Sequence, residues 1–272
     1  MTTPQILGAY YRKLNSSSMK NYSSRKENTE INTVILHYTA LSFKDSYRIL
    51  TESGKVSSHF LIDEEGVIHQ LVPLDKKAWH AGISSWRGKS DINQNSIGIE
   101  IVNPGMELKF LQKGIQVINQ CDFTDKQYFA LSDLIQKIKS SFPKITDSNI
   151  IGHSDITAKM MRKVDPGITF DWRFLNKLGH GLYYELEQNC ENKILYKFGT
   201  QNNKIKELKI SFKNFGYEID INDIFDNQLS NVIFAFQLHY DQHNTKFHKI
   251  INNTSWDLYY DKLLSNLMNN LS

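Results

Sequence analysis

Cysteine, long apolar runs and a large excess of one charge are all scarce in this sequence. Cys121 and Cys190 are its two cysteines among 272 residues, and no CxxC pair occurs. This excludes a cysteine zinc site and a thioredoxin-like redox motif, and we expect two free, partly buried thiols. No HExxH sequence occurs, which excludes the two-histidine helix of many metalloproteases. Basic residues number 32 against 29 acidic ones, an excess too small to indicate nucleic-acid binding.

The sequence also lacks the usual marks of a membrane or secreted precursor. No apolar stretch approaches the roughly 20 residues that a transmembrane helix needs. The first 30 residues are polar, without the basic start and apolar core of a secretory signal or the cysteine of a lipobox. We therefore expect no transmembrane segment, and we expect residues 1–30 to form an extended N-terminal arm.

Strand and helix patterns alternate between residues 31 and 190. The predicted strands cover residues 33–38, 58–62, 67–72, 96–102 and 149–152, and the predicted helices cover residues 43–53 and 124–142. Interleaved strands and helices are typical of an α/β fold, here a mixed β-sheet flanked by helices. In the fourth strand Ile97, Ile99 and Ile101 share one face, so we expect Glu100 to point to the other.

The sequence changes in character after about residue 190. Residues 191–204 are polar and rich in asparagine and lysine, which is typical of a linker. Apolar residues in the segment 205–272 recur at helical spacing in three runs, and no convincing strand is present. We therefore expect one domain over residues 31–190, a linker over residues 191–204, and a small all-α domain of three helices over residues 205–272.

Three side chains that suit a metal site lie at predicted strand ends or in loops. His37 lies near the end of the first predicted strand, His153 follows the last one, and Asp165 lies in a loop. Two imidazoles and one carboxylate form a ligand set for catalytic zinc that leaves a fourth position open to water. The sequence pattern alone does not show that these three side chains meet in space. A histidine at a strand end is more often simply packed or hydrogen-bonded.

Six short segments, taken together, carry a family resemblance. They are residues 35–40 (ILHYTA), 56–62 (VSSHFLI), 78–82 (AWHAG), 96–100 (SIGIE), 152–155 (GHSD) and 162–167 (RKVDPG). In this order they resemble the amidase_2 family of N-acetylmuramoyl-L-alanine amidases, of the AmpD/AmiD type. The resemblance implies the fold of that family and a zinc-dependent hydrolase. The expected reaction cleaves the amide bond between N-acetylmuramic acid, intact or 1,6-anhydro, and L-alanine, in cell-wall turnover and recycling.

The resemblance also implies roles for the residues that match its metal and catalytic positions. One zinc ion per chain is expected, bound by His37, His153 and Asp165. Glu100 falls where the family has its catalytic carboxylate, and Lys163 falls where a lysine stabilises the developing oxyanion.

Trp79, His80 and Arg87 fall in the loop that lines the substrate groove of the family. We therefore expect these three residues to bind substrate. The expected partner is peptidoglycan or a muropeptide, with no role for nucleic acid.

Residues 205–272 resemble, more loosely, the three-helix peptidoglycan-binding domain that often accompanies these amidases. A structural cap on the amidase domain is the alternative. For the chain as a whole, the second interpretation is a non-catalytic peptidoglycan-recognition module, and a phage-type lytic amidase is the third. The missing signal favours the cytoplasm and a wall-binding domain favours the periplasm, and we expect the cell envelope.

Overall fold

A mixed six-stranded β-sheet forms the centre of the N-terminal part of the protein. The computed structural model describes residues 11–13, 21–112, 114–186, 193–241 and 250–271. The strand order is β1-β5-β4-β9-β3-β12. The strands are β1 (Tyr11–Lys13), β3 (Thr33–Tyr38), β4 (Phe60–Ile62), β5 (Ile68–Gln70), β9 (Ser96–Ile101) and β12 (Ile150–Gly152). Strands β4, β9, β3 and β12 run parallel, whereas β4 and β5 form an antiparallel hairpin. The predicted mixed sheet is therefore confirmed.

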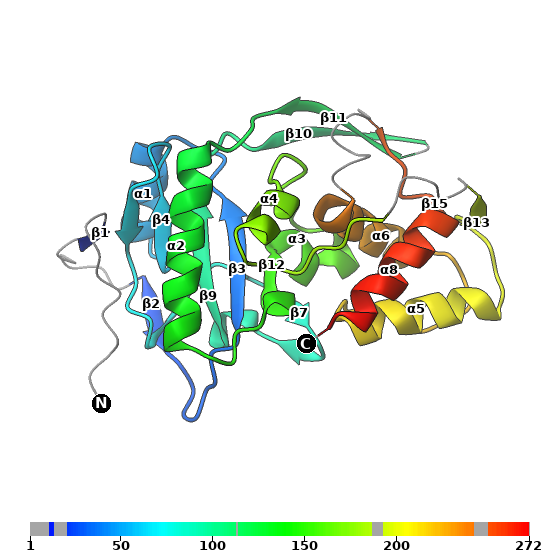
Figure 1. The fold of residues 1–272 in the computed structure, drawn as a ribbon, viewed down its shortest axis with the longest axis horizontal. Helices are drawn as coiled ribbons and strands as arrows, with labels where there is room; N and C mark the ends of the chain where they lie inside the picture. Colours follow the sequence, from blue (N-terminus) through cyan, green and yellow to red (C-terminus); the bar gives the residue numbers. More distant parts are fainter. Residues whose placement is uncertain (1–10, 14–20, 113, 187–192, 242–249, 272) are drawn as a thin grey trace.

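Helix α2 (Asp125–Ser141) covers one face of this sheet (Figure 1). It begins where the sequence predicts, because the Thr124 side chain accepts a hydrogen bond from the Gln127 N–H and the Gln127 side chain reaches back. Its buried stripe, which includes Leu131 and Leu134, packs in one apolar core with the isoleucines of β9. Because strand side chains alternate, Glu100 is left on the opposite face, as predicted.

Helix α1 covers part of the opposite face of the sheet near β4, and the C-terminal helices lie at the other end of the sheet, near β12 (Figure 1). Helix α1 (Phe43–Glu52) packs Leu50 against Leu61 of β4. The C-terminal helices are α5 (Asn203–Phe215), α6 (Asn227–Tyr240) and α8 (Leu258–Asn269), which match the three predicted helical runs. They lie on the β12 side of the sheet in Figure 1.

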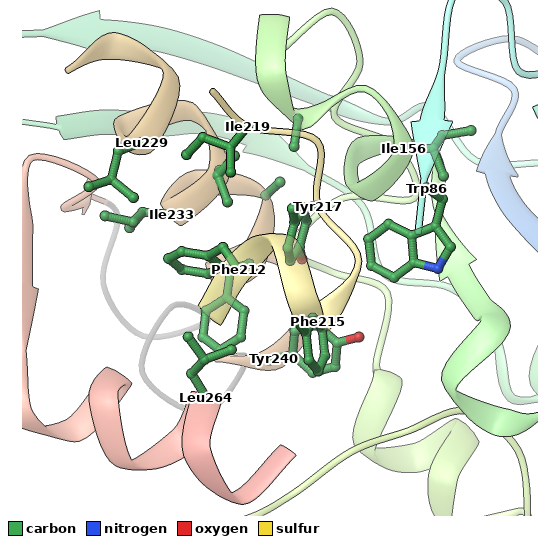
Figure 2. Packing of buried hydrophobic residues seen from close by; sticks show 14 of the residues in the cluster. Trp86, Ile156, Phe212, Phe215, Tyr217, Ile219, Leu229, Ile233, Tyr240 and Leu264 are labelled. Atoms are coloured by element: carbon green, nitrogen blue, oxygen red, sulfur yellow. The ribbon is translucent and has the colours of Figure 1, made fainter. Parts of the chain in front are cut away.

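The C-terminal helices share a hydrophobic core with the sheet. Ile35 of β3 and Ile151 of β12 belong to the same buried cluster as residues of α5, α6 and α8. Figure 2 shows Trp86 and Ile156, from the N-terminal part, close to the aromatic side chains of the C-terminal part. Trp86 meets Tyr217 edge to face, with 5.1 Å between ring centroids. The two parts are therefore packed against each other through apolar side chains and not only joined by the chain.

Several short strands lie where the sequence predicts none. Strands β13 (Ile194–Lys197) and β15 (Ser255–Asp257) pair with each other, so the predicted linker contains a strand. Strand β14 (Ile250–Ile251) pairs with β11 of the hairpin β10 (Met106–Leu111) and β11 (Gly114–Gln120). The C-terminal region is helical as predicted, but it also contains the short strands β14 and β15. They are too short for a pattern, and their partners lie far away in the sequence.

Part of the predicted N-terminal arm is paired with strands: β1 runs parallel to β5 at the edge of the six-stranded sheet, and a second pair lies outside that sheet. Strand β2 (Tyr22–Ser24) pairs with β6 (Lys76–Ala78), and the Arg25 guanidinium donates hydrogen bonds to the backbone carbonyls of Leu74, Asn93 and Ser96. Burial lowers the pKa of Arg25 to about 10. Residues 1–10 and 14–20 of the arm lie outside the described residues.

The remaining elements are short and connect these units. They are β7 (Ser85–Trp86), β8 (Lys89–Ser90), η1 (Ile92–Gln94), η2 (Asp147–Asn149), α3 (His153–Ile156), η3 (Ala158–Met160) and α4 (Trp172–Lys177). Cys121 is a free thiol but is exposed, whereas Cys190 lies outside the described residues. Among the helices that the structure describes, none is both long and apolar enough to cross a membrane.

The shared core predicts that both parts unfold together. Phe212→Ala in α5 removes a fully buried ring and should lower the free energy of unfolding by about 3–5 kcal/mol. The loss should appear in one cooperative denaturation transition, followed by circular dichroism and tryptophan fluorescence. Leu134→Ala in α2, on the far face of the sheet, is the control and should shift the same transition. An early separate transition in Phe212→Ala alone would contradict a shared core.

Candidate active site

The carboxyl ends of three neighbouring parallel strands bring the predicted site residues into one row. His37 of β3 is the register partner of Glu100 of β9, so both side chains leave the sheet on the same face. Gly152 of β12 is paired with Leu36, which places His153 beside His37 at the next position. Asp165 reaches the same place from the loop before α4, where its carbonyl accepts the backbone N–H of Ser154 at 2.9 Å.

His37, His153 and Asp165 converge on one point. The His37 Nδ1 atom lies 3.0 Å from His153 Nδ1 and 2.9 Å from Asp165 Oδ2, and His153 Nδ1 lies 3.0 Å from the same oxygen. Ligands of a tetrahedral zinc ion, at about 2.0–2.2 Å from the metal, lie roughly 3.3–3.6 Å apart. Shifts of a few tenths of an ångström would therefore fit the three atoms to a metal ion.

A chain of hydrogen bonds fixes which nitrogen of His37 carries its proton. The Ile92 carbonyl can only accept, so the Ser96 hydroxyl donates to it at 2.7 Å. Ser96 Oγ must then accept from His80 Nε2–H at 3.2 Å, which leaves His80 Nδ1 as the acceptor for His37 Nε2–H at 3.0 Å. His37 therefore turns the lone pair of Nδ1 toward His153 and Asp165.

His153 is held in the same tautomer by a backbone carbonyl. Its Nε2–H donates to the Ala81 carbonyl oxygen at 3.1 Å, so its Nδ1 also presents a lone pair to the centre. The carboxylate of Asp165 adds a third acceptor. Three acceptor atoms within 3.0 Å of one another repel unless a proton or a cation lies among them. These three residues could hold a metal ion, and the hydrogen bonds to the two imidazoles would keep the rings oriented toward it.

The protonation states favour binding of a cation. Burial and the neighbouring His153 lower the pKa of His37 to about 4, so its imidazole is neutral at pH 7. Burial alone would raise the pKa of Asp165, whereas positive charge beside its carboxylate holds that pKa well below its usual range, so a cation among the three atoms favours the ionised carboxylate. At neutral pH the centre therefore combines a neutral imidazole at His37 with an ionised carboxylate at Asp165.

Glu100 lies beside this centre without a fixed partner. Its Oε2 atom is buried and has no hydrogen-bond partner among the described residues. Burial raises the pKa of Glu100 well above its usual range, the charge of Asp165 raises it further, and the ammonium group of Lys163 opposes both. An unpartnered carboxyl group with a raised pKa is suited to accepting and returning a proton.

These groups line one cavity of about 610 Å³. The cavity is lined by residues of α1 and of the loop around Val56 and, among the site residues, by His37, Glu100, His153, Lys163 and Asp165. Its wall includes polar and apolar groups, as ligand-binding cavities generally do.

Comparison with known proteins agrees with this geometry. The model of the amidase_2 family, N-acetylmuramoyl-L-alanine amidase, matches residues 27–168. The chain belongs to this family. The N-acetylmuramoyl-L-alanine amidase AmiD of Escherichia coli is 34% identical over 221 residues, which cover 77% of this chain and 75% of that protein.

Two further comparisons show which other amidases this chain resembles. The 1,6-anhydro-N-acetylmuramyl-L-alanine amidase AmpD of Haemophilus influenzae is 42% identical over 125 residues, which cover 46% of this chain and 59% of that protein. The chain thus spans less than two thirds of the AmpD relative. The solved complex of E. coli AmiD with anhydro-N-acetylmuramic acid-L-Ala-D-γ-Glu-L-Lys has a TM-score of 0.71 at 26% identity, covering 92% of this chain and 98% of that chain.

The three predicted substrate-binding residues differ in their position relative to the cavity. Trp79 lines the cavity, and its indole N–H donates to Ser23. His80 also lines the cavity but is buried, and its ring nitrogens are used in the hydrogen bonds to His37 and Ser96. Arg87 lies outside this cavity, at the turn between β7 and β8 and beside Lys213 of α5. Its position in a hairpin turn cannot be read from the motif order.

Two residues of the site are not predicted by the sequence. Arg162 donates to the Ala81 carbonyl at 2.7 Å, the same oxygen that accepts from His153. Its signal in the sequence is its place in the segment 162–167, which assigns it no role. Gly98 leaves room for His80, because a Cβ atom there would lie 2.5 Å from the imidazole Cγ.

The hydrogen-bond chain predicts that His80 supports metal binding. His80→Ala removes the acceptor of His37 Nε2–H, so His37 is free to change its tautomer or rotate. We expect the affinity for zinc, used as the probe metal in a chelator competition, to fall roughly 10–100-fold. Trp79→Phe, in the same loop, loses only the bond to Ser23 and should bind zinc as the wild type does. Unchanged affinity in His80→Ala would remove His80 from the support of the site.

Proposed function

We propose that this protein hydrolyses the amide bond between N-acetylmuramic acid and L-alanine in peptidoglycan or muropeptides, with one zinc ion per chain. The observation that carries the proposal is the set of three acceptor atoms of His37, His153 and Asp165 within 3.0 Å of one another, beside an unpartnered Glu100. Family membership and the likeness to AmiD support the reaction class.

The nature of the donors supports zinc over other cations. Two imidazole nitrogens and one carboxylate oxygen form the ligand set of many catalytic zinc sites, whereas Mg²⁺ and Ca²⁺ prefer oxygen ligands. The chemistry that zinc supplies at such sites is polarisation of a carbonyl group and a lowered pKa, near 7, for water. His80 and the Ala81 carbonyl would hold the two imidazoles in the ligand tautomer.

Glu100 is the proposed general base and acid. Its carboxylate takes a proton from the water molecule that attacks the carbonyl carbon. The same carboxyl group returns a proton to the nitrogen of L-alanine as the C–N bond breaks. The products are the carboxylate of the muramic acid and a free amino group on the stem peptide. Acid–base catalysis of this kind contributes about 10²–10⁴-fold.

Lys163 is the proposed electrostatic catalyst. It lines the same cavity as Glu100 and lies two residues before Asp165 in the same loop. Its ammonium group can stabilise the negative charge that develops on the carbonyl oxygen in the transition state.

The proposed substrate carries a stem peptide and an N-acetylmuramic acid, either intact or in the 1,6-anhydro form. Support comes from the solved AmiD complex, whose bound substrate is anhydro-N-acetylmuramic acid-L-Ala-D-γ-Glu-L-Lys. Trp79, on the cavity wall, is the proposed contact for it. The envelope location and wall binding by residues 205–272 stay predictions from the sequence.

The test is hydrolysis of two purified muropeptides, one with anhydro and one with intact N-acetylmuramic acid. Free stem peptide should appear, its release should stop with a chelator and resume with zinc, and the ratio of the two rates defines the substrate class. Zinc-loaded protein that binds both compounds but cleaves neither would contradict the proposal and favour a recognition module.

The role of Glu100 predicts a variant that separates metal binding from turnover. Glu100→Gln keeps the shape of the side chain but cannot accept a proton, so turnover should fall at least about 100-fold. Zinc stoichiometry, measured by atomic absorption, should stay at the wild-type value. A matched control is Glu107→Gln on the exposed face of β10, which should leave both unchanged. Near-normal turnover of Glu100→Gln would exclude it as the general base.

A further inference from the structure

A buried hydrogen-bond network joins the C-terminal region to helix α3. Its centre is Asp155, which is 1% exposed. Asp155 Oδ1 accepts the hydroxyl hydrogen of Tyr217 at 2.6 Å. Asp155 Oδ2 accepts His239 Nδ1–H of α6 at 2.8 Å and the backbone N–H of Gly152 at 2.8 Å.

The two C-terminal donors are held in place by aromatic packing. The His239 ring is stacked between Trp172, at 3.7 Å between centroids, and Tyr240, at 3.8 Å. Tyr217 is 1% exposed and contacts Trp86 edge to face, as Figure 2 shows for both rings. Neither donor can therefore turn away from Asp155 without disturbing the shared core.

Asp155 stands at the junction of the two segments that carry metal-ligand candidates. The Gly152 N–H that it accepts belongs to the residue before His153, where β12 ends and α3 begins. The next residue, Ser154, donates its N–H to the carbonyl of Asp165. Gly152 is also packed against this loop, because a Cβ atom there would lie 2.8 Å from Pro166 Cδ. The position of Asp155 therefore sets how His153 faces Asp165.

We infer that Tyr217 and His239 are positioning residues of the metal site, which act on His153 through Asp155. The inference rests on the proposed zinc-dependent function. A buried carboxylate that loses a donor draws in other groups or water, so loss of either donor shifts α3. A shift of about 0.5 Å is enough to disturb a ligand set. The C-terminal region is then part of the framework of the site, whether or not it also binds glycan.

The experiment compares zinc affinity in the full chain with that of three variants. Tyr217→Phe and His239→Phe remove one donor each but keep an aromatic ring in place. Tyr240→Phe is the matched control, since it removes a hydroxyl in the same cluster that makes no hydrogen bond to Asp155 among the described residues. Folding of each variant is checked by circular dichroism, and affinity is measured by chelator competition.

We expect Tyr217→Phe and His239→Phe to bind zinc roughly 10-fold more weakly and to change the visible absorption spectrum of the cobalt-substituted protein. Tyr240→Phe should match the wild type in both. Wild-type affinity and spectrum in the folded Tyr217→Phe and His239→Phe variants, or an equal loss in Tyr240→Phe, would overturn the inference alone. A wild-type chain that binds no zinc would overturn the proposed function as well.

Discussion

Two lone pairs of imidazole nitrogens and one carboxylate are buried against one another in this protein, and most of the surrounding structure can be understood from that arrangement. His37 and His153 cannot relieve it by changing tautomer, because His80 and the Ala81 carbonyl occupy their Nε2–H groups. Burying such groups is unfavourable unless a positive charge lies among them. The arrangement could therefore hold a metal ion, with the two imidazoles already oriented toward it.

The sheet and the C-terminal region hold this arrangement together. Parallel strands place His37, Glu100 and the end of β12 side by side. This pairing fixes the direction in which the side chains point, but it does not fix the distances between their ligand atoms to within a few tenths of an ångström. That finer fit depends on loops, and the loop with Asp165 is tied to α3 through Ser154. Helix α6 completes the framework through His239 and Asp155. Residues 205–272, which the sequence predicts to be a separate domain, thus contribute to the geometry of the site.

The sequence predicted the sheet, the helix at 124–142 and the family, because these depend on local patterns and ordered motifs. The metal-ligand candidates were predicted from the motifs and meet in space as expected. The sequence did not predict the hydrogen bond between His80 and His37, because partners 43 residues apart leave no local pattern in a sequence. The β13–β15 pair and the shared core were missed for the same reason, since short strands and apolar contacts between distant segments have no periodicity. Substrate binding by Arg87 stays a prediction, because a motif gives order along the chain and not the direction of a loop, and Arg87 lines a different cavity from Glu100.

The most direct test of the account is X-ray absorption spectroscopy at the zinc edge of the full chain loaded with one equivalent of zinc. The account predicts one bound zinc with two imidazole nitrogens at about 2.0 Å, a carboxylate oxygen at about 2.0–2.2 Å and no sulfur. His80→Ala should disturb the imidazole signal without adding a new ligand type. A sulfur ligand at about 2.3 Å, or a single imidazole in the wild type, would contradict the assignment of His37, His153 and Asp165.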